Sequence, residues 1–168
     1  TELCKIYSGY SWHHDILVFD NRFISERVNQ LRKWNIGFVH GDILDEDLVK
    51  KHFKDADIVH HLAGITDVPR TKTESTKERD EKIKLVAEKG TQNILDNIIN
   101  ECKIIFPTTH VIFEGIDKVK TDIKEDDDDK PVLSYALSKS LNEKQLKQSG
   151  KKYVILRLGS VYGYSSDT

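Results

Sequence analysis

Short apolar runs alternate along the chain with longer stretches of mixed polar and apolar character. Each run is mainly apolar and ends at small, polar or turn-forming residues, which is typical of a buried β-strand. These runs predict strands at residues 16–19, 36–39, 56–62, 103–106 and 153–158, with the fourth strand stopping at Pro107.

Helical periodicity appears between the predicted strands. Residues 45–53 and 132–148 have leucines on one side, and Gly150 is a plausible stop for the second helix. A long helix near residues 80–101 is indicated by small or apolar residues that recur every three or four positions. These are Ile83, Val86, Gly90, Ile94 and Ile98. The polar stretches 66–80 and 114–131 read as loops.

This alternation predicts an α/β fold, a Rossmann-type doubly wound parallel sheet with helices on both faces. We expect residues 1–168 to form one such domain, incomplete at both ends. In folds of this kind the ligand lies beyond the carboxyl ends of the strands, so the residues that follow each strand are the informative ones. They are Asp20, Asp42, Ala63-Gly64, Thr108-Thr109 and Gly159-Ser160.

Composition narrows the class of protein. Hydrophobic residues make up 38% and charged residues 32%, as in an ordinary globular domain. A net charge of −2 gives no basic footprint for nucleic acid. No apolar run reaches the roughly 20 residues that cross a bilayer, so we expect no membrane partner. Cys4 and Cys102 lack metal-like spacing and read as reduced thiols of a cytoplasmic protein.

Tyr135 and Lys139 are four residues apart in a predicted helix, so they share one face. A phenol has a pKa of about 10 and is a poor base at neutral pH. A nearby ammonium group, together with a cationic nicotinamide ring, would lower that pKa and favour acid/base catalysis. Because short motifs also arise by chance, the alternative is an exposed lysine beside a half-buried tyrosine.

Polar residues at three other strand ends have a functional and a structural interpretation. A hydroxyl of the Thr108-Thr109 pair could hydrogen-bond the same substrate oxygen as the tyrosine, or cap its strand. Asp20 could accept the hydroxyls of an adenosine ribose and so favour NAD over NADP, with Arg22 nearby, or form a turn. Asp42 could hold the adenine amino group or cap the helix that starts near Asp45.

Neither the acidic run nor the histidines predict a metal site. The run of four aspartates before Lys130 could chelate a cation, but a solvated, self-repelling loop is the more ordinary interpretation. His60 and His61 are neighbours in a predicted strand and point to opposite faces, so they are poorly placed to share one metal. His13 and His14 have no partner cysteines nearby.

The motifs together resemble those of the extended short-chain dehydrogenase/reductase family, the nucleotide-sugar epimerases and dehydratases. The resemblance covers nearly all of the chain, in the family's order. It runs through Val-Phe-Asp-Asn at 18–21, Gly-Asp-Ile-Leu-Asp at 41–45, Asp-Ile-Val-His-His-Leu-Ala-Gly at 57–64, Gly-Thr-Gln-Asn-Ile-Leu at 90–95, Tyr-Ala-Leu-Ser-Lys at 135–139 and Leu-Arg-Leu-Gly-Ser-Val-Tyr-Gly at 156–163.

The resemblance implies an NAD-dependent enzyme that acts on a nucleotide sugar. Tyr135 would be the base, Lys139 would lower its pKa and hold the nicotinamide ribose, and Thr109 would replace the family's catalytic serine or threonine. The remaining matches would bind the dinucleotide: Asp20 and Asn21 at the adenosine ribose, Asp42 and Ile43 at the adenine, and Leu62, Ala63 and Gly64 along its path. The resemblance also implies a homodimer packed through the long helix and the helix of Tyr135.

Departures from the family pattern decide between reactions. The dehydratases usually have Asp-Glu after the threonine, whereas this chain has His110 and Val111, which favours an epimerase acting through a transient keto-sugar. A reductase or dehydratase of the same family, or a non-catalytic Rossmann-like binding protein, are the alternatives. The first strand with its glycine-rich loop and the small C-terminal substrate domain have no counterpart in residues 1–168. Ala87-Glu88 and Ser160 replace residues common in the family.

Overall fold

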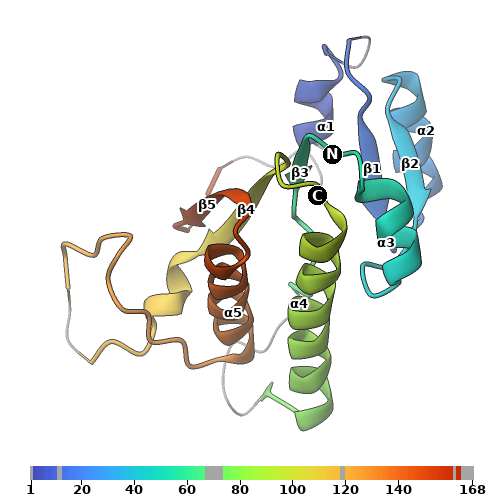
Figure 1. Cartoon of the computed structure of the whole chain (residues 1–168). Coiled ribbons are helices and arrows are strands. Elements are labelled where there is room, and N and C mark those ends of the chain that lie inside the picture. The colour runs from blue at the N-terminus through green and yellow to red at the C-terminus, as the bar shows by residue number, and fades with distance from the viewer. Residues whose placement is uncertain (1, 11–12, 67–73, 118–119, 161, 164–168) are drawn as a thin grey trace.

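A computed structural model describes the chain except residues 1, 11–12, 67–73, 118–119, 161 and 164–168. Helices and strands alternate along the described part of the chain (Figure 1). Their order is α1 (Glu2–Tyr7), β1 (Leu17–Asp20), α2 (Ser25–Lys33), β2 (Gly37–His40), α3 (Glu46–Phe53), β3 (Ile58–His60), α4 (Lys77–Asn97), β4 (Lys103–Thr109), the 3-10 helix η2 (His110–Phe113), α5 (Ser134–Gln148) and β5 (Lys152–Leu158).

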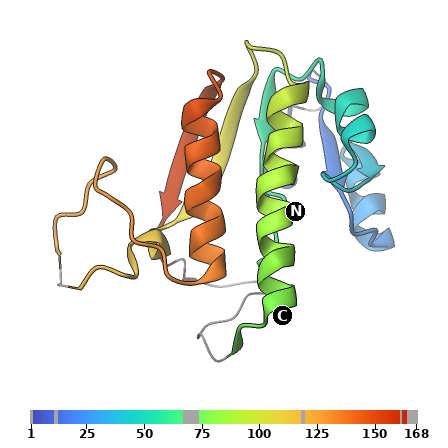
Figure 2. The ribbon, with the colours of Figure 1, turned by 60° about the horizontal axis from the view of Figure 1, so that its bottom comes forward.

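All strand pairs in the described residues are parallel, which confirms the predicted α/β class. The strands form two sheets, β1-β2 and β3-β4-β5, instead of one continuous sheet. Leu17 pairs with Gly37 in the first sheet, and Lys103 pairs with both Ile58 and Lys152 in the second. β1 and β3 lie side by side in both ribbon views without a hydrogen-bonded ladder between them (Figures 1 and 2).

Helices lie on both faces of the β1-β2 sheet and of β3, whereas the apolar residues Val154, Leu156 and Leu158 of β5 are exposed. Successive residues of a strand point to opposite faces. Val59 of β3 is buried in the cluster formed with α4. The next residue, His60, points the other way, and its Nε2 forms a 2.8 Å hydrogen bond with the hydroxyl of Tyr7 from α1. In Figure 1, α3 lies in front of β1 and β2, and α2 lies behind them.

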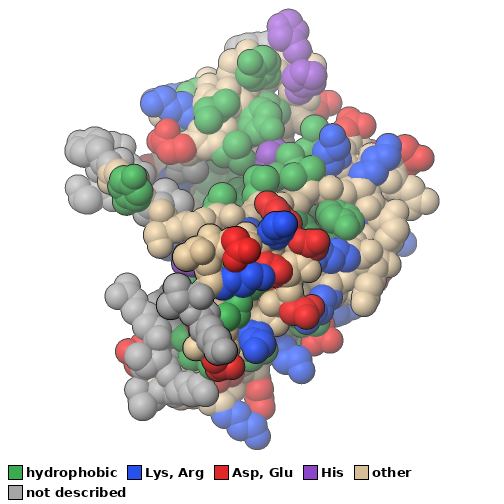
Figure 3. Space-filling view, turned by 90° about the vertical axis from the view of Figure 1, so that its left-hand side faces the viewer, with side chains coloured by type: hydrophobic (Ala, Val, Ile, Leu, Met, Phe, Trp, Pro, Cys, Tyr) green, Lys and Arg blue, Asp and Glu red, His purple; other side chains and the backbone are tan. Residues whose placement is uncertain are grey.

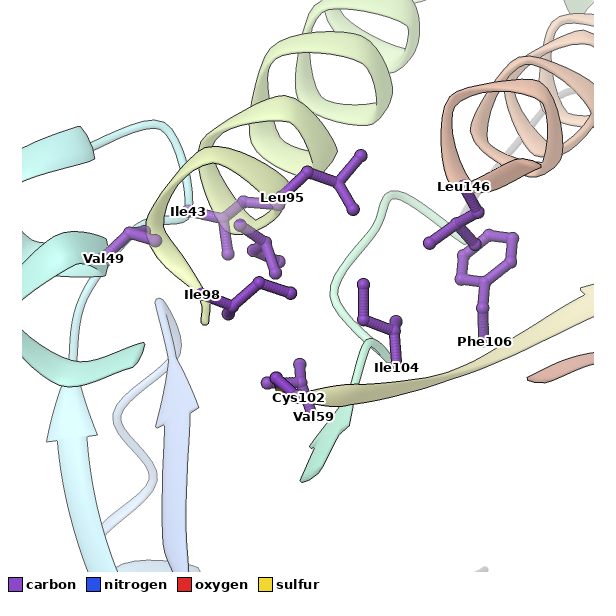
Figure 4. Packing of buried hydrophobic residues seen from close by; sticks show 10 residues of the cluster. Ile43, Val49, Val59, Leu95, Ile98, Cys102, Ile104, Phe106 and Leu146 are labelled. Atoms are coloured by element: carbon purple, nitrogen blue, oxygen red, sulfur yellow. The ribbon is translucent and has the colours of Figure 1, made fainter. Parts of the chain in front are cut away.

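The main hydrophobic core lies between the sheet and the helices α3, α4 and α5 (Figure 4). α4 comes close to the loop after β2 because Gly90 has no side chain: a Cβ there would lie 2.3 Å from Cδ1 of Ile43. The cluster consists of Ile43, Val49, Val59, Ile94, Leu95, Ile98, Cys102, Ile104, Phe106 and Leu146.

Several predicted boundaries differ from those in the structure. The strand expected to stop at Pro107 continues to Thr109. Its neighbour β3 ends at His60, so β3 has no residue that must accept an N–H from position 107, and proline, which lacks this N–H, is tolerated there. Gly150, with φ of 70°, does follow the end of α5. The loop expected at 66–80 gives way to α4 at Lys77, and its residues 67–73 lie outside the described part.

The acidic run lies in a loop, as expected, with Asp126 and Asp128 exposed to solvent, while the other two aspartates are anchored to neighbouring residues. Asp127 forms an ion pair with Lys120 at 2.7 Å, and Asp129 contacts Ser140 and lies 3.7 Å from Lys144. Figure 3 accordingly shows acidic and basic side chains interspersed on this side of the molecule. Within the described residues, no group of three or more candidate ligands could hold a metal ion.

Neither thiol in the described chain is in a disulfide: Cys102 is buried and Cys4 is partly buried. Among the described residues, no helix combines the length and the apolar character needed to span a bilayer.

Candidate active site

The residues predicted to bind adenosine lie together at the carboxyl ends of β1 and β2. Asp20 is the last residue of β1 and pairs with His40 of β2. The side chain of Asn21 donates a 3.4 Å hydrogen bond to Oδ2 of Asp42, which joins the two strand ends. Oδ1 of Asp20 accepts the N–H of Arg22 at 2.8 Å, so the turn-forming interpretation of Asp20 is correct for one of its two oxygens.

Asp42 and Ile43 also form hydrogen bonds within the protein. Oδ1 of Asp42 accepts the N–H of Leu44 at 2.9 Å, and the N-cap of α3 is Asp45, so the suggestion that Asp42 caps this helix is wrong. The side chain of Ile43 is buried, and its carbonyl accepts a 2.8 Å hydrogen bond from Asn93. A ligand at this edge would therefore meet the main chain of Ile43.

The segment after β3 is open. Leu62 is 56% exposed, and Ala63 and Gly64 are also exposed. A Cβ added to Gly64 would have no atom within 4 Å, so the surroundings of this glycine leave its main chain accessible.

Tyr135 and Lys139 lie on one face at the start of α5, as their spacing predicts. The ammonium nitrogen of Lys139 is 5.9 Å from the centre of the tyrosine ring, and both residues are partly buried. Burial raises the pKa of Tyr135 in the protein alone. The lowered value expected from the sequence also involves a cationic nicotinamide ring, so it stays a prediction. At this distance in the protein alone, the lysine charge does not outweigh the cost of burying a phenolate.

Lys139 is held by the end of β4. Its Nζ donates a 3.2 Å hydrogen bond to the carbonyl of Pro107 and lies 4.5 Å from the centre of the Phe106 ring. The Pro107 carbonyl is available because β4 extends beyond its partner β3 at this point. Burial lowers the pKa of Lys139 to about 8, so the side chain remains mostly protonated at neutral pH.

A buried polar network that sequence reasoning missed lies next to this pair. His61 is 3% exposed, and its Nε2 is 2.8 Å from the hydroxyl of Thr91, which also accepts a 2.9 Å hydrogen bond from Asn142. The His61 ring packs 5.4 Å from that of Phe106, the ring that also contacts Lys139. Burial, with a smaller effect of the lysine charge, lowers the pKa of His61 to about 4.

Thr109 ends β4 and caps the short helix that follows. Its hydroxyl oxygen accepts the N–H of Val111 at 3.3 Å, which agrees with the capping interpretation and leaves the hydroxyl proton to be donated. Its neighbour Thr108 is buried on the opposite face of the strand. His110 is exposed, and its Nδ1 is 3.2 Å from the carbonyl of Leu158.

The fold and this arrangement at the strand ends define a protein of the Rossmann type. The family model for the RmlD substrate binding domain matches residues 22–168, and the chain therefore belongs to that family. This match and the solved structures below agree with the resemblance to the extended short-chain dehydrogenase/reductases.

Solved structures of sugar-nucleotide epimerases have the same fold. UDP-glucose 4-epimerase of Thermotoga maritima, crystallised with UDP-glucose, aligns with 90% of this chain and 50% of its own, at 20% identity and a TM-score of 0.69. UDP-glucuronic acid 4-epimerase of Bacillus cereus, crystallised with NAD, aligns with 96% and 53%, at 20% identity and a TM-score of 0.71. UDP-Glc/GlcNAc 4-epimerase of Campylobacter jejuni aligns with 92% and 49%, at 20% identity and a TM-score of 0.68. The chain spans about half the length of these structures.

Proposed function

We propose that the protein is an NAD-dependent nucleotide-sugar epimerase that acts through a transient keto-sugar. The observation that carries the proposal is the pairing of Tyr135 with Lys139 at the start of α5, with Nζ 5.9 Å from the tyrosine ring and anchored to the end of β4. Family membership and the fold shared with NAD-bound and UDP-sugar-bound epimerases support it.

The strand-end residues suit a dinucleotide by their chemistry. The second oxygen of Asp20 would accept the adenosine ribose hydroxyls with help from Asn21, and a carboxylate there disfavours the 2′-phosphate of NADP. Asp42 would face the adenine together with the main chain of Ile43. Leu62, Ala63 and Gly64 would line the path of the dinucleotide, where the open surroundings of Gly64 permit close approach. When bound, NAD accepts a hydride from the sugar and returns it.

The chain's own residues would move the proton. Tyr135 would remove it from a sugar hydroxyl, while the Lys139 ammonium would stabilise the phenolate and bind the nicotinamide ribose. Thr109 would donate its hydroxyl proton to the reacting oxygen. Because burial raises the pKa of Tyr135 in the protein alone, we infer that the positive charge of the bound cofactor is needed to bring this pKa toward neutrality.

His110 and Val111 determine which reaction we favour. Neither supplies the carboxyl pair that would protonate and deprotonate neighbouring carbons, so loss of water is disfavoured and epimerisation preferred. A reductase or dehydratase of the same family, or a binding protein without catalysis, remain the alternatives.

The split sheet suggests how the domain is completed. We propose that a further strand of the full-length protein joins β1 to β3, and that the glycine-rich turn after it holds the cofactor pyrophosphate. We also propose a homodimer packed through α4 and α5, where Leu85 and Leu137 are each about half exposed. Light scattering would test the homodimer by measuring the molar mass, which Leu137→Asp should reduce to that of a monomer.

Product analysis tests the proposed reaction. Full-length protein would be incubated with NAD and, in turn, UDP-glucose, UDP-glucuronic acid and UDP-N-acetylglucosamine, and the sugars identified by NMR. We expect an epimer without net formation of NADH. A sugar at another oxidation level, formed with stoichiometric cofactor turnover, would identify a reductase, and an unsaturated or deoxy keto-sugar a dehydratase. NAD binding without any product would support the non-catalytic alternative.

A further inference from the structure

The helix that carries Tyr135 begins without a cap of its own. Leu133 is at the N-cap position of α5, and an apolar side chain cannot accept the hydrogen bonds that the first turn of a helix offers. Tyr135 is the second residue of this helix. Whatever fixes the first turn of α5 therefore also fixes the backbone of the tyrosine.

Glu114, from another part of the chain, holds the two residues that lead into this helix. Its Oε1 accepts the N–H of Val132 at 2.8 Å and that of Leu133 at 2.6 Å. A carboxylate that accepts two backbone N–H groups forms charge-assisted hydrogen bonds, and its negative charge is favourable at the N-terminus of a helix.

The backbone beside Glu114 reinforces this contact. The N–H of Gly115 donates to the carbonyl of Lys130 at 2.9 Å, and the N–H of Lys130 donates to the carbonyl of Ile112 at 2.8 Å. A Cβ at Gly115 would lie only 2.5 Å from the Lys130 carbonyl oxygen, so the close approach depends on glycine. The turn after β4 is thus tied to the segment that leads into α5.

Asp80 holds the same turn from the other side. One of its carboxylate oxygens accepts the hydroxyl of Ser134, the first residue of α5, and the other accepts the hydroxyl of Ser75. These hydrogen bonds lower the pKa of Asp80, which stays ionised at neutral pH. Asp80 lies in the first turn of α4, so it joins the beginnings of the two helices.

We propose that Glu114 and Asp80 are positioning residues, which hold the first turn of α5 so that the Tyr135 hydroxyl meets the reacting oxygen. The inference rests on the proposed function, because it assigns Tyr135 to catalysis. Neither carboxylate contacts substrate in this scheme. Displacements of about 1 Å cost as much as 100-fold in rate when a reacting group is misplaced, so a small shift of this turn is sufficient to impair turnover.

The test uses full-length protein and four variants. Glu114→Ala removes both hydrogen bonds, whereas Glu114→Gln keeps an oxygen that can accept them. Glu101→Gln, at an exposed carboxylate outside this turn, is the matched control. Asp80→Asn tests the hydrogen bonds of Asp80 with Ser134 and Ser75 if Glu114→Ala does not fold. Each protein is assayed for kcat on the UDP-sugar that the wild type converts, for NAD affinity, and for hydrogen exchange of the peptide spanning residues 130–139.

We expect Glu114→Ala to lower kcat by roughly 10- to 100-fold, with NAD affinity nearly unchanged and faster exchange confined to the start of α5. Glu114→Gln should keep a kcat and an exchange rate close to those of the wild type. Unchanged kcat and exchange in Glu114→Ala would overturn the proposal, as would an equal loss in Glu114→Gln. If the wild type converts no sugar, the proposed function fails by itself. Unaltered exchange in Glu114→Ala would then separately refute the claim that Glu114 holds the start of α5.

Discussion

His61 makes the stability of the protein depend on pH in a direction that the structure fixes. Its ring is buried beside Phe106 and Thr91, and burial lowers its pKa from the ordinary 6.5 to about 4. Because the folded-state pKa is below that of the unfolded chain, only the unfolded chain binds the proton between these two values. The free energy of unfolding is therefore highest above pH 6.5 and decreases as the pH falls.

The magnitude follows from the two pKa values. A tenfold change in proton affinity corresponds to about 1.4 kcal/mol, so His61 alone accounts for a loss of about 3 kcal/mol between pH 6.5 and about 4. About 2 kcal/mol of this should be lost by roughly pH 5. For a domain whose total stability is about 5–15 kcal/mol, such a loss is easily measured.

Urea unfolding of full-length protein from about pH 7.5 to about pH 4.5, followed by tryptophan fluorescence, measures this dependence. His61→Gln does not titrate there and can still hydrogen-bond Thr91, so its stability should fall by about 2 kcal/mol less across the range. His13→Gln, at an exposed histidine, is the control and should behave like the wild type. Equal pH dependence in the wild type and His61→Gln would refute the assignment of a buried neutral imidazole.

Three further predictions concern packing, charge and cofactor choice. Glu143 is buried and accepts a 2.7 Å hydrogen bond from Arg157. Glu143→Ala should therefore lower the free energy of unfolding by about 3–5 kcal/mol in urea titrations. A loss below about 1 kcal/mol would show that the pair is not buried in solution. Gly90→Ala places a methyl group against Ile43 and should cost about 1–3 kcal/mol, part of which Ile43→Val should recover. No recovery in the double variant would contradict the close contact. Calorimetric titration should show tighter binding of NAD than of NADP, with the preference reduced in Asp20→Ala; tighter NADP binding by the wild type would refute the role given to Asp20.

Strands were the most predictable part of the fold. Runs such as 104–106 are apolar throughout, which is typical of strands in a parallel sheet. α2 was not predicted, because all its residues other than the buried Val28 and Leu31 are polar or charged. The extension of β4 through Pro107 could not be read either, because it depends on where the neighbouring strand β3 ends.

The candidate site was predictable in its residues and not in its contacts. Spacing alone placed Tyr135 and Lys139 on one face, and strand ends pointed to Asp20 and Asp42. The partner of Lys139, the carbonyl of Pro107, follows from strand register and helix packing, which no local pattern encodes. The burial of Tyr135, which raises its pKa in the protein alone, likewise follows from packing that the sequence pattern does not encode.

Comparison of two tyrosine variants tests the central claim most directly. Tyr135→Phe removes one hydroxyl from the candidate site, and Tyr153→Phe removes one from β5, at the opposite end of the strand from the site. With full-length protein, NAD and a converted UDP-sugar, we predict that Tyr135→Phe loses turnover by at least about 100-fold while binding NAD normally, and that Tyr153→Phe keeps wild-type turnover. Wild-type turnover in Tyr135→Phe would contradict the account.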